Sequence, residues 1–80
     1  MTEALTENAE NLLRQVVALT RKYPSGEVPD RILWEEAKLD YEAYVEAAQQ
    51  LVANELADRH TSDFATLKAT PKGMKWARGV

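Results

Sequence analysis

Apolar residues recur at intervals of three and four along the first part of the chain and predict a helix over residues 6–23. Acidic residues at Glu7 and Glu10 suit the first turn of such a helix, and the chain must leave the helix before Pro24. Its predicted apolar stripe is Leu5, Ala9, Leu12, Leu13, Val16, Leu19 and Tyr23.

Two further helices are predicted after the turn YPSGEVP, in which Val28 is held extended before Pro29. Asp30 is expected to cap a short helix over residues 31–38. Asp40 is expected to cap the next helix, over residues 41–54. The residues predicted to be buried in these two helices are Ile32, Leu33 and Ala37 in the first, and Tyr44, Val45, Ala48, Leu51 and Val52 in the second.

The helical spacing stops after residue 56, and the pattern predicts a two-stranded hairpin over residues 57–69 with its tip near Ser62–Asp63. Phe64 and Leu67 are the bulky apolar residues of this hairpin. Thr70 and Pro71 read as the cap and first residue of a terminal helix over residues 71–78. Met74 and Trp76 of that helix are expected to close the core.

Length and composition indicate one small globular domain over residues 1–80, with 45% hydrophobic residues and no cysteine. The acidic N-terminus and the lack of a long apolar run predict a cytoplasmic protein without a membrane segment. We expect no catalytic site, cofactor, metal or small-molecule substrate, because the chain has one histidine and no phosphate-binding glycine loop. His60 is interpreted as a solvent-facing residue.

The charge is unevenly distributed along the sequence. Residues 1–58 carry twelve acidic and five basic residues, whereas residues 59–80 carry five basic residues and one acidic residue. Such an asymmetry affects the choice of partner more than the fold.

The order of predicted elements resembles that of winged helix-turn-helix domains, as in small bacterial or phage regulators. Counting from Asp40, that family places core residues four, eight, eleven and sixteen positions later. Those positions hold Tyr44, Ala48, Leu51 and Leu56, with the small residue Ala37 before the cap and the segment Ala69-Thr70-Pro71-Lys72-Gly73 after the wing. The resemblance implies a mainly α fold with a small β-hairpin, namely a three-helix core plus a short C-terminal wing.

One position departs from the family pattern. Glu55 stands where the family has a glycine, so we expect Asn54 to adopt the left-handed backbone conformation that ends the third helix.

The resemblance also implies that the third helix carries the binding surface. Its outward face is predicted to be Glu42, Ala43, Glu46, Ala47, Gln49, Gln50 and Ala53, with no Lys or Arg. Glu42 and Glu46 oppose binding to a polyanion, so the first interpretation is a protein partner with a basic surface, which the acidic helix contacts as a regulator, an inhibitor or a DNA mimic. The predicted partner-binding residues are Glu42, Glu46, Gln49 and Gln50, flanked by Trp34 and Tyr41.

The alternative interpretation is a DNA-binding transcriptional regulator. Gln49 and Gln50 would then read bases, while phosphates would be bound by Arg31, Arg59, Lys68 and Lys72. The chain is predicted to be a monomer, or a dimer formed through the apolar stripe of its first helix, at Leu12, Leu13, Val16 and Val17. A role as a small subunit of a larger assembly is a third possibility.

Overall fold

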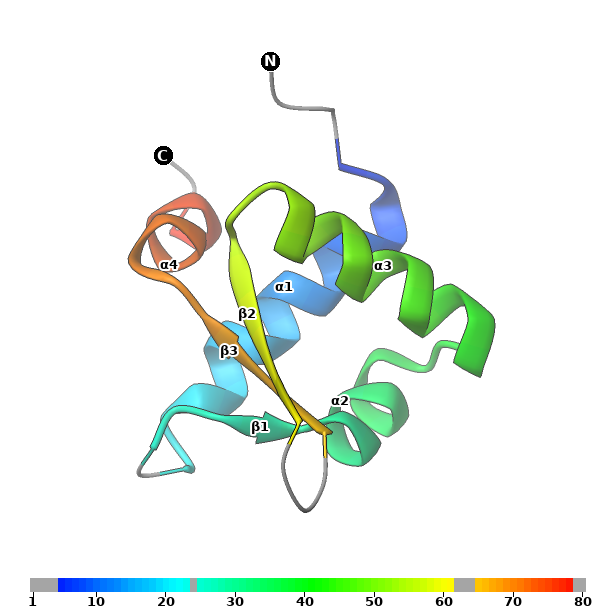
Figure 1. The fold of residues 1–80 in the computed structure, drawn as a ribbon, viewed down its shortest axis with the longest axis horizontal. Coiled ribbons are helices and arrows are strands. Elements are labelled where there is room, and N and C mark those ends of the chain that lie inside the picture. Colours follow the sequence, from blue (N-terminus) through cyan, green and yellow to red (C-terminus); the bar gives the residue numbers. More distant parts are fainter. Residues whose placement is uncertain (1–4, 24, 62–64, 79–80) are drawn as a thin grey trace.

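The computed structural model describes residues 5–23, 25–61 and 65–78. In chain order the elements are α1 (Glu7–Thr20), β1 (Val28–Pro29), α2 (Asp30–Ala37), α3 (Tyr41–Ala53), β2 (Ala57–Thr61), β3 (Ala65–Ala69) and α4 (Pro71–Ala77). Their order is the predicted one (Figure 1). The predicted hairpin tip at Ser62–Asp63 and the residue Phe64 lie outside the described residues.

Helix α1 begins at its cap Thr6, whose hydroxyl accepts a hydrogen bond from the amide of Ala9 at 3.2 Å. The helix ends at Thr20, earlier than the predicted end at residue 23. The chain tightens there, because the amides of Lys22 and Tyr23 donate to carbonyls three residues back. The hydroxyl of Thr20 also donates to the Val16 carbonyl at 2.7 Å.

Helices α1, α2 and α3 enclose the core together with the inner face of the sheet. Leu12, Leu13 and Val16 are fully buried within the single chain, and Val17 is partly buried. The proposal that this stripe serves a dimer is therefore wrong for its main residues, which belong to the core. Met74 and Trp76 pack against the same core, as predicted.

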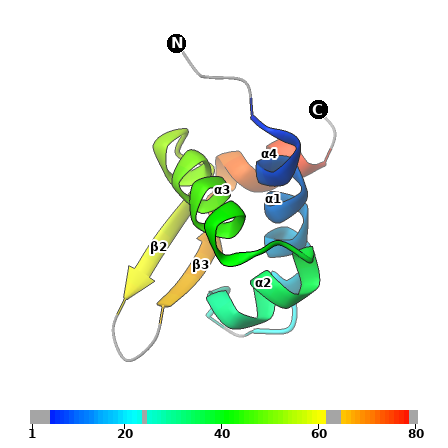
Figure 2. The same ribbon diagram turned by 90° about the vertical axis from the view of Figure 1, so that its right-hand side faces the viewer.

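The strands form one antiparallel sheet in the order β1-β3-β2. Strand β1 pairs with the central strand through Val28 and Leu67, so the extended residue before Pro29 becomes an edge strand. In the hairpin, Arg59 lies opposite Leu67 and Asp58 lies opposite Lys68. Figure 2 shows this hairpin extending away from the helices.

The chain leaves α3 through Glu55, which takes the left-handed backbone conformation with φ 61°. The prediction that Asn54 would do so is wrong, since its φ is −95° and its side-chain amide donates to the Gln50 carbonyl at 2.8 Å. The amide of Leu56 donates to the Leu51 carbonyl, which closes the helix end. Glu55 therefore adopts the conformation that the family gives to glycine, at a cost of about 1 kcal/mol.

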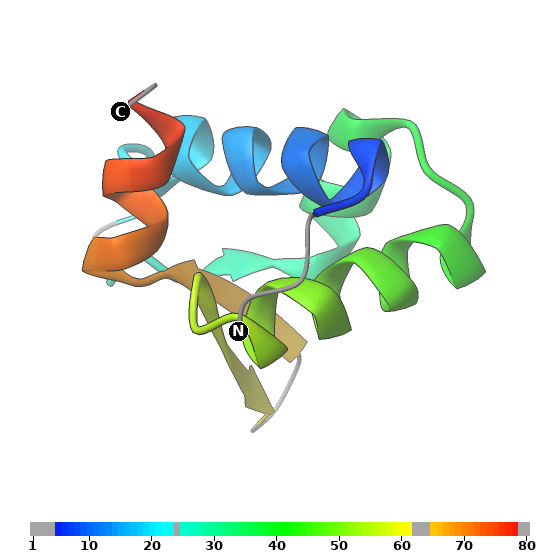
Figure 3. The same ribbon diagram turned by 90° about the horizontal axis from the view of Figure 1, so that it is seen from above.

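The segment from Thr70 to Gly73 fastens α4 to the end of α3. The hydroxyl of Thr70 accepts from the Gly73 amide at 3.0 Å, which confirms the predicted cap, and donates to the Glu55 carbonyl at 2.7 Å. The ammonium group of Lys72 donates to the Asn54 carbonyl at 3.2 Å. Figure 3 shows helix α4 at the end of the molecule opposite the α2–α3 turn.

Candidate functional site

The outward face of α3 is acidic. Tyr44, Ala47, Ala48 and Leu51 are buried in the core, which leaves Glu42, Glu46 and Gln49 exposed on the opposite side of the helix. No ion pair between described residues involves Glu42 or Glu46. The face therefore presents two carboxylates and one free amide to solvent.

Two residues of α3, one alanine and one valine, lie on the opposite side of the helix from the side predicted for them. Ala47, predicted to face outward, is 2% exposed, and Val52, predicted to be buried, is 39% exposed. The core stripe is centred on Tyr44 and Leu51, and Ala47 lies on the inner side of that line while Val52 lies outside it.

The two glutamines of α3 differ in their surroundings. Gln50 is half-buried, and its Oε1 accepts a hydrogen bond from the Thr6 amide at 2.8 Å, at the start of α1. Gln49 is exposed. Of the predicted pair, Gln49 has the freer side chain for contact with a partner.

Asp30 joins three elements. Its Oδ1 accepts a hydrogen bond from the Tyr44 hydroxyl of α3 at 2.6 Å, and its Oδ2 accepts one from the Arg59 guanidinium of β2 at 2.7 Å. The prediction that Asp30 caps α2 is wrong, because Pro29 holds the cap position and Asp30 is the first helical residue. The carboxylate is used between elements instead, and it fixes the start of the wing against α2 and α3.

Tyr44 gives this contact a pH dependence. Burial raises the pKa of the Tyr44 hydroxyl well above its ordinary value, and the hydrogen bond to Asp30 and the charge of Asp30 raise it further. Since an unfolded tyrosine titrates near about pH 10, the folded state holds more protons than the unfolded state above that pH. The stability contributed by the protonated hydroxyl is therefore lost as the pH rises above about 10.

We expect the Tyr44→Phe variant to lose less stability than the natural chain between about pH 9 and about pH 11. At neutral pH the variant should be less stable by about 1 kcal/mol, because Asp30 loses one hydrogen bond. Urea unfolding of both proteins across this pH range measures the difference. Equal losses of stability in the two proteins would show that folding does not raise the pKa of the Tyr44 hydroxyl.

The four basic residues proposed for phosphate contact do not form one cluster. Arg31 is exposed at the start of α2, and Arg59 lies nearby through its bond to Asp30. Lys68 projects from the face of the sheet that is turned away from the core, because side chains alternate along β3 and the neighbouring Leu67 points into the core. Lys72 lies at the far end of α3, on the Asn54 carbonyl.

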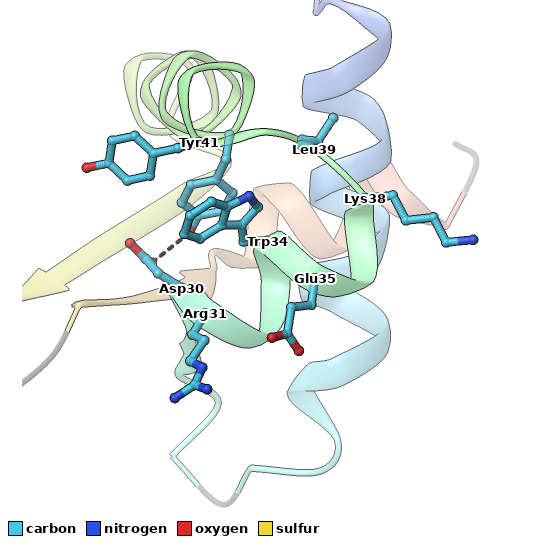
Figure 4. Close-up of a pocket in the computed structure, with 8 residues that line it drawn as sticks. Asp30, Arg31, Trp34, Glu35, Lys38, Leu39 and Tyr41 are labelled. Carbon is cyan, nitrogen blue, oxygen red and sulfur yellow. Dashed lines mark hydrogen bonds between the residues drawn. The ribbon is translucent and has the colours of Figure 1, made fainter.

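Trp34 and Tyr41 meet at the turn between α2 and α3, with ring centroids 5.4 Å apart and ring planes at 56°. They line a cleft together with Leu39, Asp30 and the buried Tyr44. Figure 4 shows Arg31, Glu35 and Lys38 directed away from the Trp34 ring, whereas the Asp30 carboxylate is directed toward the Tyr44 hydroxyl. Trp34 and Tyr41 therefore lie together at the α2–α3 turn, and their role in flanking a partner-binding face stays a prediction.

His60 is exposed on β2, and its Nδ1 lies 3.8 Å from the Glu27 carboxylate. In the part of the chain that the structure describes, no group of three or more His, Cys, Asp or Glu residues is arranged to hold a metal ion. Within the same ranges, the helices lack the combination of length and apolar character needed to cross a membrane.

Sequence reasoning missed two contributors to this site, Asp30 as a link between elements and Thr6 as the partner of Gln50. A local sequence pattern does not predict any of these three hydrogen bonds, because the bonded residues are 14, 29 and 44 positions apart in the sequence.

No protein-family model matches the chain, and no curated protein matches it significantly. Two solved structures have a similar fold. The PcaV transcriptional regulator of Streptomyces coelicolor, solved with its natural ligand, aligns with 95% of the chain at a TM-score of 0.78 and 22% identity. A mutant of Lactococcus lactis ZitR aligns with 99% of the chain at a TM-score of 0.77 and 16% identity.

The chain spans 52% of the length of each of these two proteins. At these identities the likeness establishes the arrangement of the elements. The predicted fold is thereby confirmed, and the chain has the winged helix fold that it shares with PcaV and ZitR.

Proposed function

We propose that the chain is a non-catalytic DNA-binding domain of a transcriptional regulator, in which α3 and the adjoining wing contact the duplex. The observation that carries this proposal is the likeness of 95% of the chain to the PcaV transcriptional regulator. This was the alternative interpretation of the sequence, and the structural comparison favours it over the protein-partner interpretation. It also agrees with the predicted cytoplasmic location.

Arg31, Gln49 and Arg59 are the residues assigned to DNA in this proposal. Gln49 is exposed on the outward face of α3, where its amide can bond to adenine N6 and N7. Arg31 is exposed at the start of α2 and is assigned to a phosphate. Arg59 can share its guanidinium between Asp30 and a phosphate, because its side chain is 34% exposed.

The acidic face of α3 sets the strength of this binding. Phosphate neutralisation supplies most of the non-specific affinity of DNA-binding proteins, and α3 contains no basic residue. A single winged helix also contacts one half-site. We therefore expect modest affinity with a shallow dependence on salt, set by about two phosphate contacts.

Fluorescence anisotropy of a labelled duplex, recorded over a series of salt concentrations, tests this proposal. We expect log affinity to fall with log salt at a slope of about −2, and Arg31→Ala to make the slope shallower by about 0.9. Lys75→Ala, on α4 at the other end of the molecule, is the matched control and should leave the slope unchanged. Absence of binding at low salt would contradict the proposal.

Docking on a basic protein surface is a second candidate function. The observation that favours it is the pair of exposed carboxylates on α3, Glu42 and Glu46, which form no ion pair with described residues. Such a face repels phosphate and complements a cationic surface. The two candidates predict opposite effects of reversing these charges on binding to DNA and to a basic protein.

A further inference from the structure

Trp34, Tyr41 and Val52 are the large hydrophobic residues that the described part of the chain leaves exposed. Two of them meet at the α2–α3 turn, where Trp34 is 38% and Tyr41 is 58% exposed. Their rings border a cleft of about 610 Å³, here called the α2–α3 cleft, which the buried Tyr44 also lines. Adjacent exposed rings over a cleft are typical of protein interaction sites, whereas single exposed apolar residues are common on any surface.

The charged residues that line this cleft are of both signs. Asp30 is bonded to Arg59 at 2.7 Å, so that pair contributes no net charge. The other charged residues of the lining are basic at Arg31 and Lys38 and acidic at Glu35. All three are exposed, and none forms an ion pair with another described residue. Figure 4 shows them directed away from the indole ring, so the cleft has an aromatic centre and unpaired charges of both signs at its edge.

This arrangement selects an occupant that carries both charges around an aromatic centre. An acidic segment would face Glu35 as a like charge, and a basic segment would face Arg31 and Lys38. An apolar segment would pack on the rings but would desolvate the charges at the edge without pairing them. A second copy of the same surface supplies an opposite charge for each charged position and an aromatic pair for each aromatic pair.

We propose that the chain self-associates through the α2–α3 cleft, in a two-fold symmetric dimer in which Trp34 of each copy packs against Tyr41 of the other. A two-fold interface repeats every contact in reverse, so each favourable pair of residues occurs twice. Packed aromatic pairs stabilise an interface beyond the apolar area that they bury. Glu35 of each copy faces the basic side chains Arg31 and Lys38 of the other.

This surface replaces the buried apolar stripe of α1 as the place of dimerisation. The inference goes beyond the proposed function and does not rest on it. Glu42, Glu46 and Gln49 of α3 do not line the cleft. The dimer carries two α3 helices, and a dimer of a DNA-binding domain contacts two half-sites where a monomer contacts one.

Sedimentation velocity of the natural chain over a concentration series tests self-association. Interfaces that bury less than about 1,200 Å² are weak, and the exposed residues of the cleft are few, so we expect a dissociation constant on the order of 0.1 mM. The weight-average sedimentation coefficient should rise from the monomer value toward the dimer value across that concentration. A monomer value throughout a series that extends well above it would overturn the proposal.

Charge variants test whether the cleft is the interface. Glu35→Lys makes the unpaired charges of the edge wholly basic, and Arg31→Glu/Lys38→Glu makes them wholly acidic. We expect dimerisation of each variant alone to weaken about tenfold or more, because like charges then face each other. An equimolar mixture of the two variants should dimerise at least as strongly as the natural chain, because the charges are again complementary.

Matched controls change the same charges outside the cleft. Glu36→Lys, at an exposed position of α2, is the control for Glu35→Lys. Arg21→Glu/Lys22→Glu, at the end of α1, is the control for the acidic variant. Both controls should dimerise like the natural chain, and circular dichroism checks that every variant is folded before mixing.

Substitution of the indole ring is the second, independent variant. Trp34→Ala should weaken dimerisation about tenfold, whereas Val52→Ala, at an equally exposed position outside the cleft, should leave it unchanged. Dimerisation that persists in Trp34→Ala, or a mixture of the two charge variants that stays monomeric, would overturn the cleft as the interface. These measurements use no DNA, so the inference and the DNA-binding proposal can fail separately.

Discussion

Replacement of Gly73 by alanine is expected to lower the free energy of unfolding by about 3 kcal/mol or more. A Cβ atom at this position would lie 2.0 Å from the backbone oxygen of Leu56 and 3.3 Å from Leu13. The Leu56 oxygen belongs to the junction between α3 and β2 and also accepts the Thr70 amide, so it cannot move without breaking that bond. Helix α4 would have to shift away from α1 and α3.

The sign of this effect distinguishes tertiary packing from local helix propensity. In an exposed helix, replacing glycine by alanine stabilises by about 1 kcal/mol. Chemical unfolding measures the sign of this change in Gly73→Ala, with Lys75→Ala at an exposed position of the same helix as the control. A stabilised or unchanged Gly73→Ala protein would show that α4 does not pack against Leu56 as described.

Reversal of both α3 carboxylates in Glu42→Lys/Glu46→Lys is expected to raise DNA affinity roughly 60-fold at about 0.1 M salt. Each added phosphate contact contributes about 0.9 to the slope of log affinity against log salt, so two contacts multiply the affinity by that factor. The slope should steepen by about 1.8. Anisotropy titration with the labelled duplex measures both quantities.

The charge-matched control is Glu7→Lys/Glu36→Lys. It changes the net charge of the protein by the same amount, but on α1 and α2 instead of α3, and should raise DNA affinity much less. Circular dichroism checks the fold, since Glu42 lies in the first turn of α3 and favours the helix there. If the doubly reversed protein binds DNA no better and loses a basic protein or peptide partner, the docking candidate replaces the DNA-binding proposal.

The spacing of large apolar residues predicted the helices well, because each helix buries bulky side chains on one side only. Leu12, Leu13 and Leu51 are fully buried as expected. The pattern failed for Ala47 and Val52, where a small residue is buried and a branched one is exposed. At the edge of a stripe, side-chain size says little about which way a position faces.

The sequence predicted which charged and amide side chains of α3 are exposed, but not the contacts that surround them. Glu42, Glu46 and Gln49 are exposed on α3 as expected. Their surroundings depend on contacts between distant segments, such as the bond from Arg59 to Asp30. Similarly, the face on which Lys68 lies follows from strand register, which residue spacing does not fix.

An amide-resolved NMR titration with a mixed-sequence duplex tests most directly whether α3 and the adjoining wing contact DNA. At low salt we predict shifts concentrated in α3 between Tyr41 and Gln49, at Arg31 and along β2, and their reversal at physiological salt. Shifts absent at low salt, or confined to α1 and α4, would contradict the claim.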